Sequence, residues 1–337
     1  MGVWKDCGWM TRLGTCFYNR KAEAERLARL SQRFPTVLLA GPRNVGKSEL
    51  ATYTLVRVMK VNPLIIDARR GVAKSLVGDR LEPLEKRVAQ AILRVLAEKA
   101  GLAPLIDAIR SAYEHIRFDR YVLVDEVHLV ARDAVRELEA VAKMLRFYPE
   151  YRGWRLIVTT SEGVLLSARI ADRLDGYGAR VVIVEPLGEE DARALYEEYV
   201  GTHGCRVEFH AYWGLVGGLP GYLPDLCSMA EAELLDWIER RATLLVQAVL
   251  EAAEAAGLEA RQACMDAYEL LVEKRPIRKP SDPSLARTLT RRNIAYPKGL
   301  QLQPQLNVYR AILAAWARSG CLEPPEPRNV LREALHS

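Results

Sequence analysis

The chain has 337 residues, of which 50% are hydrophobic and 27% are charged, and its formal net charge is +5. This composition excludes disordered and fibrous proteins, and the length allows about two domains that each bury a core. The charge is too small on its own to indicate a nucleic-acid-binding protein. Because the sequence has neither a signal-peptide core nor an apolar run long enough to span a bilayer, we expect a cytoplasmic protein without a membrane partner.

Six cysteines lie far apart in the sequence and form no CxxC pair. This spacing argues against a zinc site and against a dense disulfide framework, so we expect mostly buried thiols. Whether Cys7 and Cys16 pair stays open, because disulfides inside cells are characteristic of hyperthermophiles.

Residues 17–33 are predicted to form a helix that has Asn19 as its N-cap and its apolar residues near one face. The helix directly precedes a buried strand. It is therefore either an ordinary packing helix or an element that covers an adenine ring. The candidate adenine contacts are residues 17–20, among them Asn19 and Arg20.

A buried strand over residues 37–40 leads into a glycine-containing loop, and a helix is predicted to follow over 49–59. The two glycines of the loop allow successive N–H groups to converge on an anion, at the positive end of the helix dipole. This pattern is typical of a phosphate-binding loop, in which Lys47 reaches the β- and γ-phosphates and the Ser48 hydroxyl ligates Mg²⁺. The candidate nucleotide-binding residues are Gly41, Pro42, Arg43, Asn44, Val45, Gly46, Lys47, Ser48 and Glu49.

A second short buried strand covers residues 64–67, and residues 81–117 carry apolar side chains at helical spacing with a break at Gly101 and Pro104. The helical positions before the break are Leu84, Val88, Ile92, Val95 and Leu96. Helices between parallel strands predict an α/β fold, with a parallel sheet flanked by helices.

The next strand, over residues 120–124, ends in two carboxylates. If this end lies beside the phosphate-binding loop, Asp125 is placed to hold Mg²⁺ and Glu126 to polarise the water that attacks the γ-phosphate. His128 either contacts phosphate or water or satisfies a helix end, and we favour the helix end.

Residues 155–161 form a further strand that closes on three hydroxyl side chains. Thr160 and Ser161 are candidate sensors of the γ-phosphate, and the alternative is that they cap the following turn. In the next segment, Arg169 or Arg173 is placed either to stabilise transition-state charge from a neighbouring subunit or to be solvated and ion-paired.

After a last strand over 179–184 the chain becomes helical, with a glycine-rich turn at 217–223 that contains Pro220, a candidate nucleotide contact. After an Ala- and Leu-rich helix through about 256, a helix near 259–273, a short helix at 284–292 and an extended hairpin follow in the order of a winged-helix domain. The predicted domains are a P-loop core at 1–186, a helical lid at 187–235 and a winged-helix-like domain at 236–337.

Residues 274–298 concentrate much of the positive charge, with Asp282 as their single acid. We expect contact with duplex DNA phosphates, with Tyr296 and Lys298 on the wing. The alternative is that this domain packs on its own ATPase domain and uses its cations in ion pairs. The basic residues are Lys274, Arg275, Arg278, Lys279, Arg287, Arg291, Arg292 and Lys298.

Together these motifs resemble the archaeal ATPase family, P-loop NTPases near the AAA+ and STAND groups, over nearly the whole chain. The resemblance rests on four segments, at 17–20, 41–48, 124–128 and 217–223, followed by the winged-helix order. It implies binding of ATP and Mg²⁺, slow or regulated hydrolysis, and a lid that couples the nucleotide state to the C-terminal domain. His128 stands where members often have Gln, and Ser48 where they often have Thr.

Our leading hypothesis is an ATP-hydrolysing switch or motor that acts on duplex DNA through the winged helix. The alternative is a signalling or scaffold ATPase of the STAND type, whose C-terminal domain binds a protein partner or a second copy of the chain. A helicase is disfavoured, because the chain has room for one such domain only.

Overall fold

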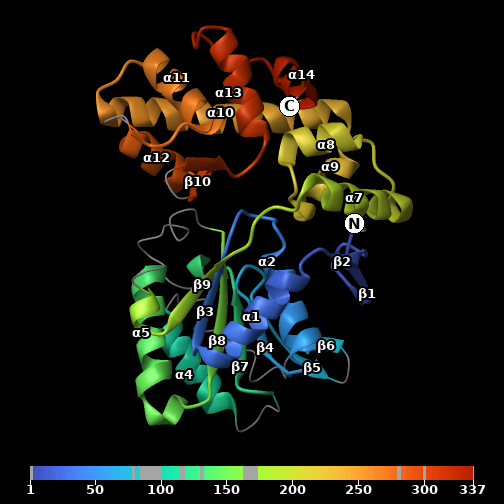
Figure 1. Ribbon diagram of the computed structural model, residues 1–337, viewed down its shortest axis with the longest axis vertical. Helices are drawn as coiled ribbons and strands as arrows, with labels where there is room; N and C mark the ends of the chain where they lie inside the picture. The colour runs from blue at the N-terminus through green and yellow to red at the C-terminus, as the bar shows by residue number, and fades with distance from the viewer. Residues whose placement is uncertain are drawn as a thin grey trace. The chain divides into compact units, whose positions relative to one another are not determined.

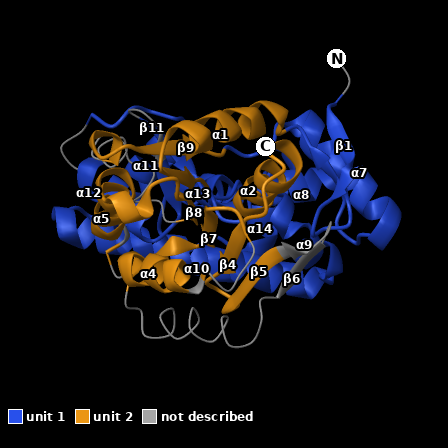
Figure 2. Ribbon diagram, turned by 90° about the horizontal axis from the view of Figure 1, so that it is seen from below, with its two compact units in different colours: residues 1–19, 42–45, 185–337 blue, residues 20–41, 46–184 orange. Residues whose placement is uncertain are grey.

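A computed structural model describes residues 3–77, 80–83, 101–113, 118–129, 133–161, 174–278, 282–298 and 301–336. Two compact units make up the chain and are coloured separately in Figure 2. The sheet unit comprises residues 20–41 and 46–184, and the helical unit comprises residues 1–19, 42–45 and 185–337.

The sheet unit is built on a seven-stranded sheet of order β6-β5-β4-β7-β8-β3-β9. Strands β4, β7, β8, β3 and β9 are parallel to one another, which confirms the predicted α/β fold. Strands β5 and β6 form an antiparallel edge. Residues 81–83 belong to this edge and not to a helix. The strands are β3 (Thr36–Ala40), β4 (Leu64–Asp67), β5 (Val72–Val77), β6 (Arg80–Pro83), β7 (Tyr121–Asp125), β8 (Arg155–Thr160) and β9 (Ala179–Ile183).

Helices cover both faces of this sheet (Figure 1). The crossover from β3 to β4 and the crossovers from β4 to β7 and β7 to β8 run in opposite directions along the sheet, so right-handed connections place their helices on opposite faces. Gly101, at φ 105°, precedes α4, but Pro104 lies in the first turn of this helix and does not break it as predicted. The predicted helical positions between Leu84 and Leu96 lie outside the described residues. The helices are α1 (Lys21–Arg33), α2 (Lys47–Tyr53), η1 (Thr54–Val58), α4 (Leu102–Ala112), η3 (Val127–Leu129), α5 (Ala134–Phe147) and η4 (Pro149–Tyr151).

Strand β3 lies inside the sheet and all five of its residues are buried, as its unbroken apolar sequence predicts. Its register aligns Ala40 with Thr160 of β8, and the register of β4 aligns Asp67 with Asp125 of β7. Because these strands are parallel, their carboxyl ends meet at one edge, where the loops that follow them gather.

The helical unit begins with the hairpin β1–β2 and continues as helices with one further hairpin, β10–β11. The predicted order of a helix, a short helix and an extended hairpin appears as α11, α12 and β10–β11. No described helix combines the length and the apolar character that crossing a membrane requires. The elements are β1 (Lys5–Met10), β2 (Cys16–Tyr18), α7 (Glu189–His203), α8 (Phe209–Val216), η6 (Pro220–Tyr222), α9 (Leu223–Ser228), α10 (Glu231–Ala256), α11 (Ala260–Leu271), α12 (Asp282–Arg291), β10 (Ala295–Lys298), β11 (Gln301–Pro304), α13 (Val308–Arg318) and α14 (Pro327–His336).

The expectation that Asn19 caps the first helix is wrong. Residues 16–18 form β2, so the chain enters α1 from a strand, and Arg20 is the N-cap residue, although its side chain does not cap the helix. Asn19 has a left-handed backbone, at φ 36°, and its amide donates to the carboxylate of Asp191 on α7.

All six cysteines form disulfides, which corrects the expectation of buried thiols. The pairs are Cys7–Cys16, Cys205–Cys227 and Cys264–Cys321, and all three lie in the helical unit. The partners are separated by 9, 22 and 57 residues, so only the fold brings them together.

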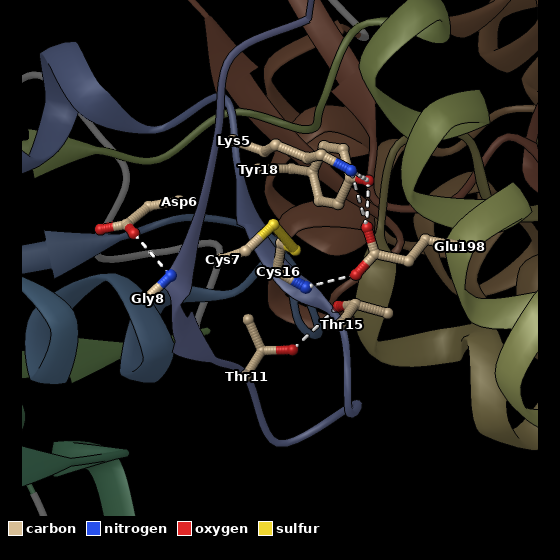
Figure 3. Close-up of a disulfide and its surroundings, with 9 residues drawn as sticks. All are labelled: Lys5, Asp6, Cys7, Gly8, Thr11, Thr15, Cys16, Tyr18 and Glu198. Carbon is tan, nitrogen blue, oxygen red and sulfur yellow. Dashed lines mark hydrogen bonds and ion pairs between the residues drawn. A yellow bond between two sulfur atoms is a disulfide. The ribbon is translucent and has the colours of Figure 1, made fainter.

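The Cys7–Cys16 hairpin is held to α7 by one carboxylate, that of Glu198 (Figure 3). Glu198 accepts hydrogen bonds from the Cys16 N–H at 2.6 Å and the Tyr18 hydroxyl at 2.5 Å, and its Oε2 lies 3.3 Å from the Lys5 amine. Burial opposes ionisation of this carboxyl, but the three donors outweigh it and hold the pKa of Glu198 below its usual value.

Replacing both Cys264 and Cys321 by serine is expected to lower the free energy of unfolding by about 2–5 kcal/mol, because the disulfide closes a long loop in the unfolded chain. Chemical denaturation of oxidised protein measures this loss. Adding a thiol reductant should destabilise the wild type by more than it destabilises the double variant. Equal stability of the two oxidised proteins would contradict the prediction.

Candidate nucleotide-binding site

The loop between β3 and α2 has the backbone of an anion-binding site. Asn44 and Gly46 both have left-handed backbones, at φ 65° and 97°, and Gly46 directly precedes the first helical residue, Lys47. The Lys47 side chain is 4% exposed, and its amine donates to the carbonyl of Gly41 at 3.0 Å. The ammonium group therefore lies folded against the start of the loop, within reach of a phosphate bound there.

The middle of this loop, residues 42–45, is grouped with the helical unit. The Gly221 N–H donates to the Asn44 carbonyl at 3.0 Å, and a Cβ atom at Gly221 would lie 2.8 Å from the Asn44 Cβ. Only glycine permits this approach. The predicted turn at 217–223 thus contacts the loop through Gly221, while Pro220 begins the short helix η6 next to it.

Asp125 ends β7 beside this loop and is 7% exposed. Its Oδ1 accepts hydrogen bonds from the Ser48 hydroxyl at 2.6 Å and from the Thr159 hydroxyl at 2.5 Å. A hydroxyl and a carboxylate oxygen side by side fit Mg²⁺, which takes one or two protein oxygens and completes its shell with phosphate and water. Ser48 and Asp125 are therefore the candidate cation site.

Glu126 follows in a left-handed backbone conformation, at φ 58°, which is uncommon for a residue with a side chain and typical of functional sites. The Thr159 hydroxyl oxygen accepts from the Glu126 N–H at 2.9 Å. The Ser161 hydroxyl donates to Glu126 Oε2 at 2.9 Å, and His128 Nδ1 lies 3.3 Å from the same oxygen. The carboxylate of Glu126 is therefore held in one orientation.

Two residues of this network, Thr159 and Arg69, were missed by the sequence analysis. Side chains alternate along a strand, so Thr159 and Ser161 share a face of β8 and Thr160 faces the other side. That alternation was a sequence signal for Thr159. Arg69 lies 3.6 Å from Glu126 Oε1 because β4 pairs with β7, and the strand order cannot be inferred from the sequence.

The remaining predicted site residues lie elsewhere or are not described. Arg20 is buried and pairs with Glu23 at 3.0 Å, and Glu49 lies in the first turn of α2. Arg169 and Arg173 lie outside the described residues. The structure therefore brings Lys47, Ser48, Asp125, Glu126 and Ser161 to one edge of the sheet.

Replacing Thr159 by valine is expected to destabilise the protein by about 1–3 kcal/mol, because the buried Asp125 carboxylate loses a donor and the Glu126 N–H loses its acceptor. Thr36→Val is the matched control, since Thr36 is also a fully buried strand residue and its hydroxyl has no hydrogen-bond partner among the described residues. Urea unfolding of both variants measures the difference. Equal effects of the two substitutions would contradict the role assigned to Thr159.

A phosphate-binding loop between a buried parallel strand and a helix, with an acid pair at the end of a neighbouring strand, defines a P-loop nucleotide-binding protein. The model of a family described as an ATPase domain predominantly from Archaea matches residues 17–226, more than half of the chain. The chain belongs to this archaeal ATPase family.

A Walker-type ATPase of known structure shares this fold. A Walker-type ATPase of Pyrococcus abyssi is 18% identical with a TM-score of 0.53, covering 90% of this chain and 97% of its own. The ORC2 protein of Aeropyrum pernix, solved in ADPNP and ADP complexes, is 13% identical with a TM-score of 0.42, covering 100% of both chains. Cdc6p from Pyrobaculum aerophilum is 10% identical with a TM-score of 0.42, and the match covers 93% of this chain and 97% of the Cdc6p chain. No curated protein matches this sequence significantly.

Proposed function

We propose that the protein is a Mg²⁺-dependent ATPase that hydrolyses ATP slowly or on stimulation by a partner and works as a switch or motor. The observation that carries the proposal is the hydrogen-bonded chain from Ser48 through Asp125 and Thr159 to Glu126. These hydrogen bonds join a cation site to a carboxylate held in one orientation. A site that only binds nucleotide does not need such an oriented carboxylate.

In this proposal Lys47 binds the β- and γ-phosphates, and Ser48 with Asp125 holds Mg²⁺, which when bound neutralises phosphate charge. Glu126 accepts a hydrogen bond from the attacking water and orients it towards phosphorus. Ser161 senses the γ-phosphate through its hydrogen bond to Glu126. Asn19, Arg20 and Pro220 as nucleotide contacts, and Arg173 acting from a second subunit, remain predictions.

The turn at 217–223 supports a lid that responds to the nucleotide, because the Gly221 N–H bonds directly to the loop at Asn44. We propose that residues 187–235 form this lid between a core at 1–186 and a C-terminal domain at 236–337. Phosphate bound on the loop would change the position of Asn44, and the lid would follow.

Duplex DNA is the proposed target of residues 274–298, and part of their charge is available for it. Lys274, Arg278 and Arg287 are exposed. Exposed cations on α12 and on the loop before it can neutralise phosphates along a duplex, which makes the binding dependent on salt.

A protein partner is the second candidate, because ion pairs within the helical unit occupy part of the charge that DNA would need. Arg275 makes a bidentate pair with Asp282 at 2.8 Å, and Arg292 pairs with Glu251 at 2.8 Å. Arg291 also contacts Glu251. Tyr296 is buried, and burial raises its pKa to about 12, so it is no surface contact for DNA.

ATP turnover with and without duplex DNA separates the two candidates in one assay. DNA stimulation that is lost in an Arg278→Gln, Arg287→Gln variant supports the DNA target. Unchanged turnover, with no binding of duplex DNA even at low salt, rejects it and leaves the protein partner. An Arg240→Gln variant is the control, since Arg240 is exposed but lies on α10 outside this region.

Intracellular disulfides are common in hyperthermophiles, so the three disulfides are compatible with the predicted cytoplasmic location in such an organism.

A further inference from the structure

Two exposed aromatic rings stand at the edge of the sheet unit opposite the nucleotide loop. Phe147 ends α5 and is 65% exposed, and Tyr148 follows it and is 55% exposed. Large aromatic side chains are normally covered in a folded protein, so a pair of adjacent exposed rings indicates an interaction surface.

A hollow lies on each side of these rings. The first has a volume of about 520 Å³ and is lined by Lys143, Gly176 and Tyr177 together with both rings. The second has a volume of about 400 Å³ and includes Pro35, Arg146, Arg152 and Arg155 together with the same two rings. Phe147 and Tyr148 therefore form a ridge between two open hollows, and we call this surface the aromatic ridge.

The aromatic ridge is strongly basic. One lysine and three arginines line the hollows, and no carboxylate does among the described residues. Arg146 lies over the Phe147 ring with 5.2 Å between the guanidinium carbon and the ring centroid, and Lys143 lies 4.2 Å from the Tyr177 centroid. The nearby Asp175 carboxylate is paired with Arg180 and does not neutralise this charge.

The ridge is separate from the ATP site. Pro35 and Arg155 stand at the amino ends of β3 and β8, whereas the nucleotide loop follows the carboxyl end of β3. A five-residue strand spans about 17 Å, so the residues of the ridge do not line the loop.

We propose that the aromatic ridge binds single-stranded nucleic acid. Bases stack on exposed aromatic rings, and phosphates pair with the surrounding cations. Two hollows that share a pair of rings accommodate bases on either side of the ridge. An acidic peptide would satisfy the cations, but it does not account for two adjacent exposed rings flanked by guanidinium groups. The inference does not depend on DNA binding by residues 274–298.

Fluorescence anisotropy with the full chain tests this proposal. The probes are a labelled oligothymidylate of about 12 nucleotides and an abasic deoxyribose-phosphate oligomer of the same length and charge. The wild type should bind the oligothymidylate at least about tenfold more tightly. The Phe147→Ala, Tyr148→Ala double variant should bind both probes equally, because it has lost the stacking surface.

The charge contribution has its own matched pair of variants. Arg152→Gln should weaken binding of both probes and reduce the salt dependence, while Arg136→Gln should change neither. Arg136 lies in the first turn of the same helix α5 and its side chain is 84% exposed, so it controls for loss of one surface charge. All variants should bind ATP as the wild type does, which shows that they are folded.

Several results would overturn the proposal. No binding of the oligothymidylate at low salt would reject the surface as a nucleic-acid site. Equal affinity of the wild type for the abasic probe would reject base stacking. Competition by polyglutamate as effective as that by unlabelled oligothymidylate would indicate an acidic protein partner instead.

Discussion

Replacing Glu126 by glutamine is expected to slow ATP hydrolysis about a hundredfold or more, while ATP stays bound. The amide keeps the size of the side chain but cannot act as a base toward the attacking water, and a positioned base contributes about 10²–10⁴ in rate. The hydrogen bond from Ser161 can still be made to the amide oxygen, so the orientation of the side chain should be retained. Release of phosphate from radiolabelled ATP measures the rate, and equilibrium titration measures the affinity.

Glu150→Gln is the control for this substitution, because Glu150 is an exposed acid in the same unit that lies beyond α5. It should hydrolyse ATP at the wild-type rate. Normal turnover of the Glu126 variant would show that another group activates the water, and His128 or Arg69 would then have to be tested, as both lie beside Glu126.

Lys47→Ala is expected to weaken ATP binding by about 10- to 150-fold, which corresponds to the loss of one charge-assisted hydrogen bond of roughly 1.5–3 kcal/mol. The buried ammonium group bonds to the Gly41 carbonyl, and no other lysine lies in the loop. Titration with a fluorescent ATP analogue measures the change.

Folding should survive this substitution, since alanine is favourable in the first turn of a helix. Lys143→Ala removes an exposed lysine from α5 and should leave the affinity for the analogue unchanged. Wild-type affinity of the Lys47 variant would contradict the assignment of the phosphate site.

The parts of the site that were predicted from the sequence are those whose residues are contiguous in the chain. The loop at 41–48 and the pair Asp125 and Glu126 each lie at the end of one strand and in the residues directly after it. Their residue types and their position after a buried strand therefore identify them in the sequence. The α/β fold was predicted for the same reason, because alternating buried strands and helices leave few other arrangements.

The parts that were missed depend on neighbours that are distant in the sequence. Arg69 approaches Glu126 only because β4 and β7 are adjacent, and Cys264 meets Cys321 only after the helices of that unit pack. The Asn19 cap failed because pairing of β2 with β1 overrode the local preference of the asparagine. Thr159 differs from these residues, because the alternation of side chains between the two faces of β8 can be inferred from the sequence.

A single-turnover assay with radiolabelled ATP and excess enzyme tests the central claim most directly, because it detects even slow hydrolysis. We predict that bound ATP is converted to ADP and phosphate with Mg²⁺, that EDTA abolishes the conversion, and that Asp125→Asn reduces it strongly. ATP that stays bound but intact with Mg²⁺, or hydrolysis that continues in EDTA, would contradict the account.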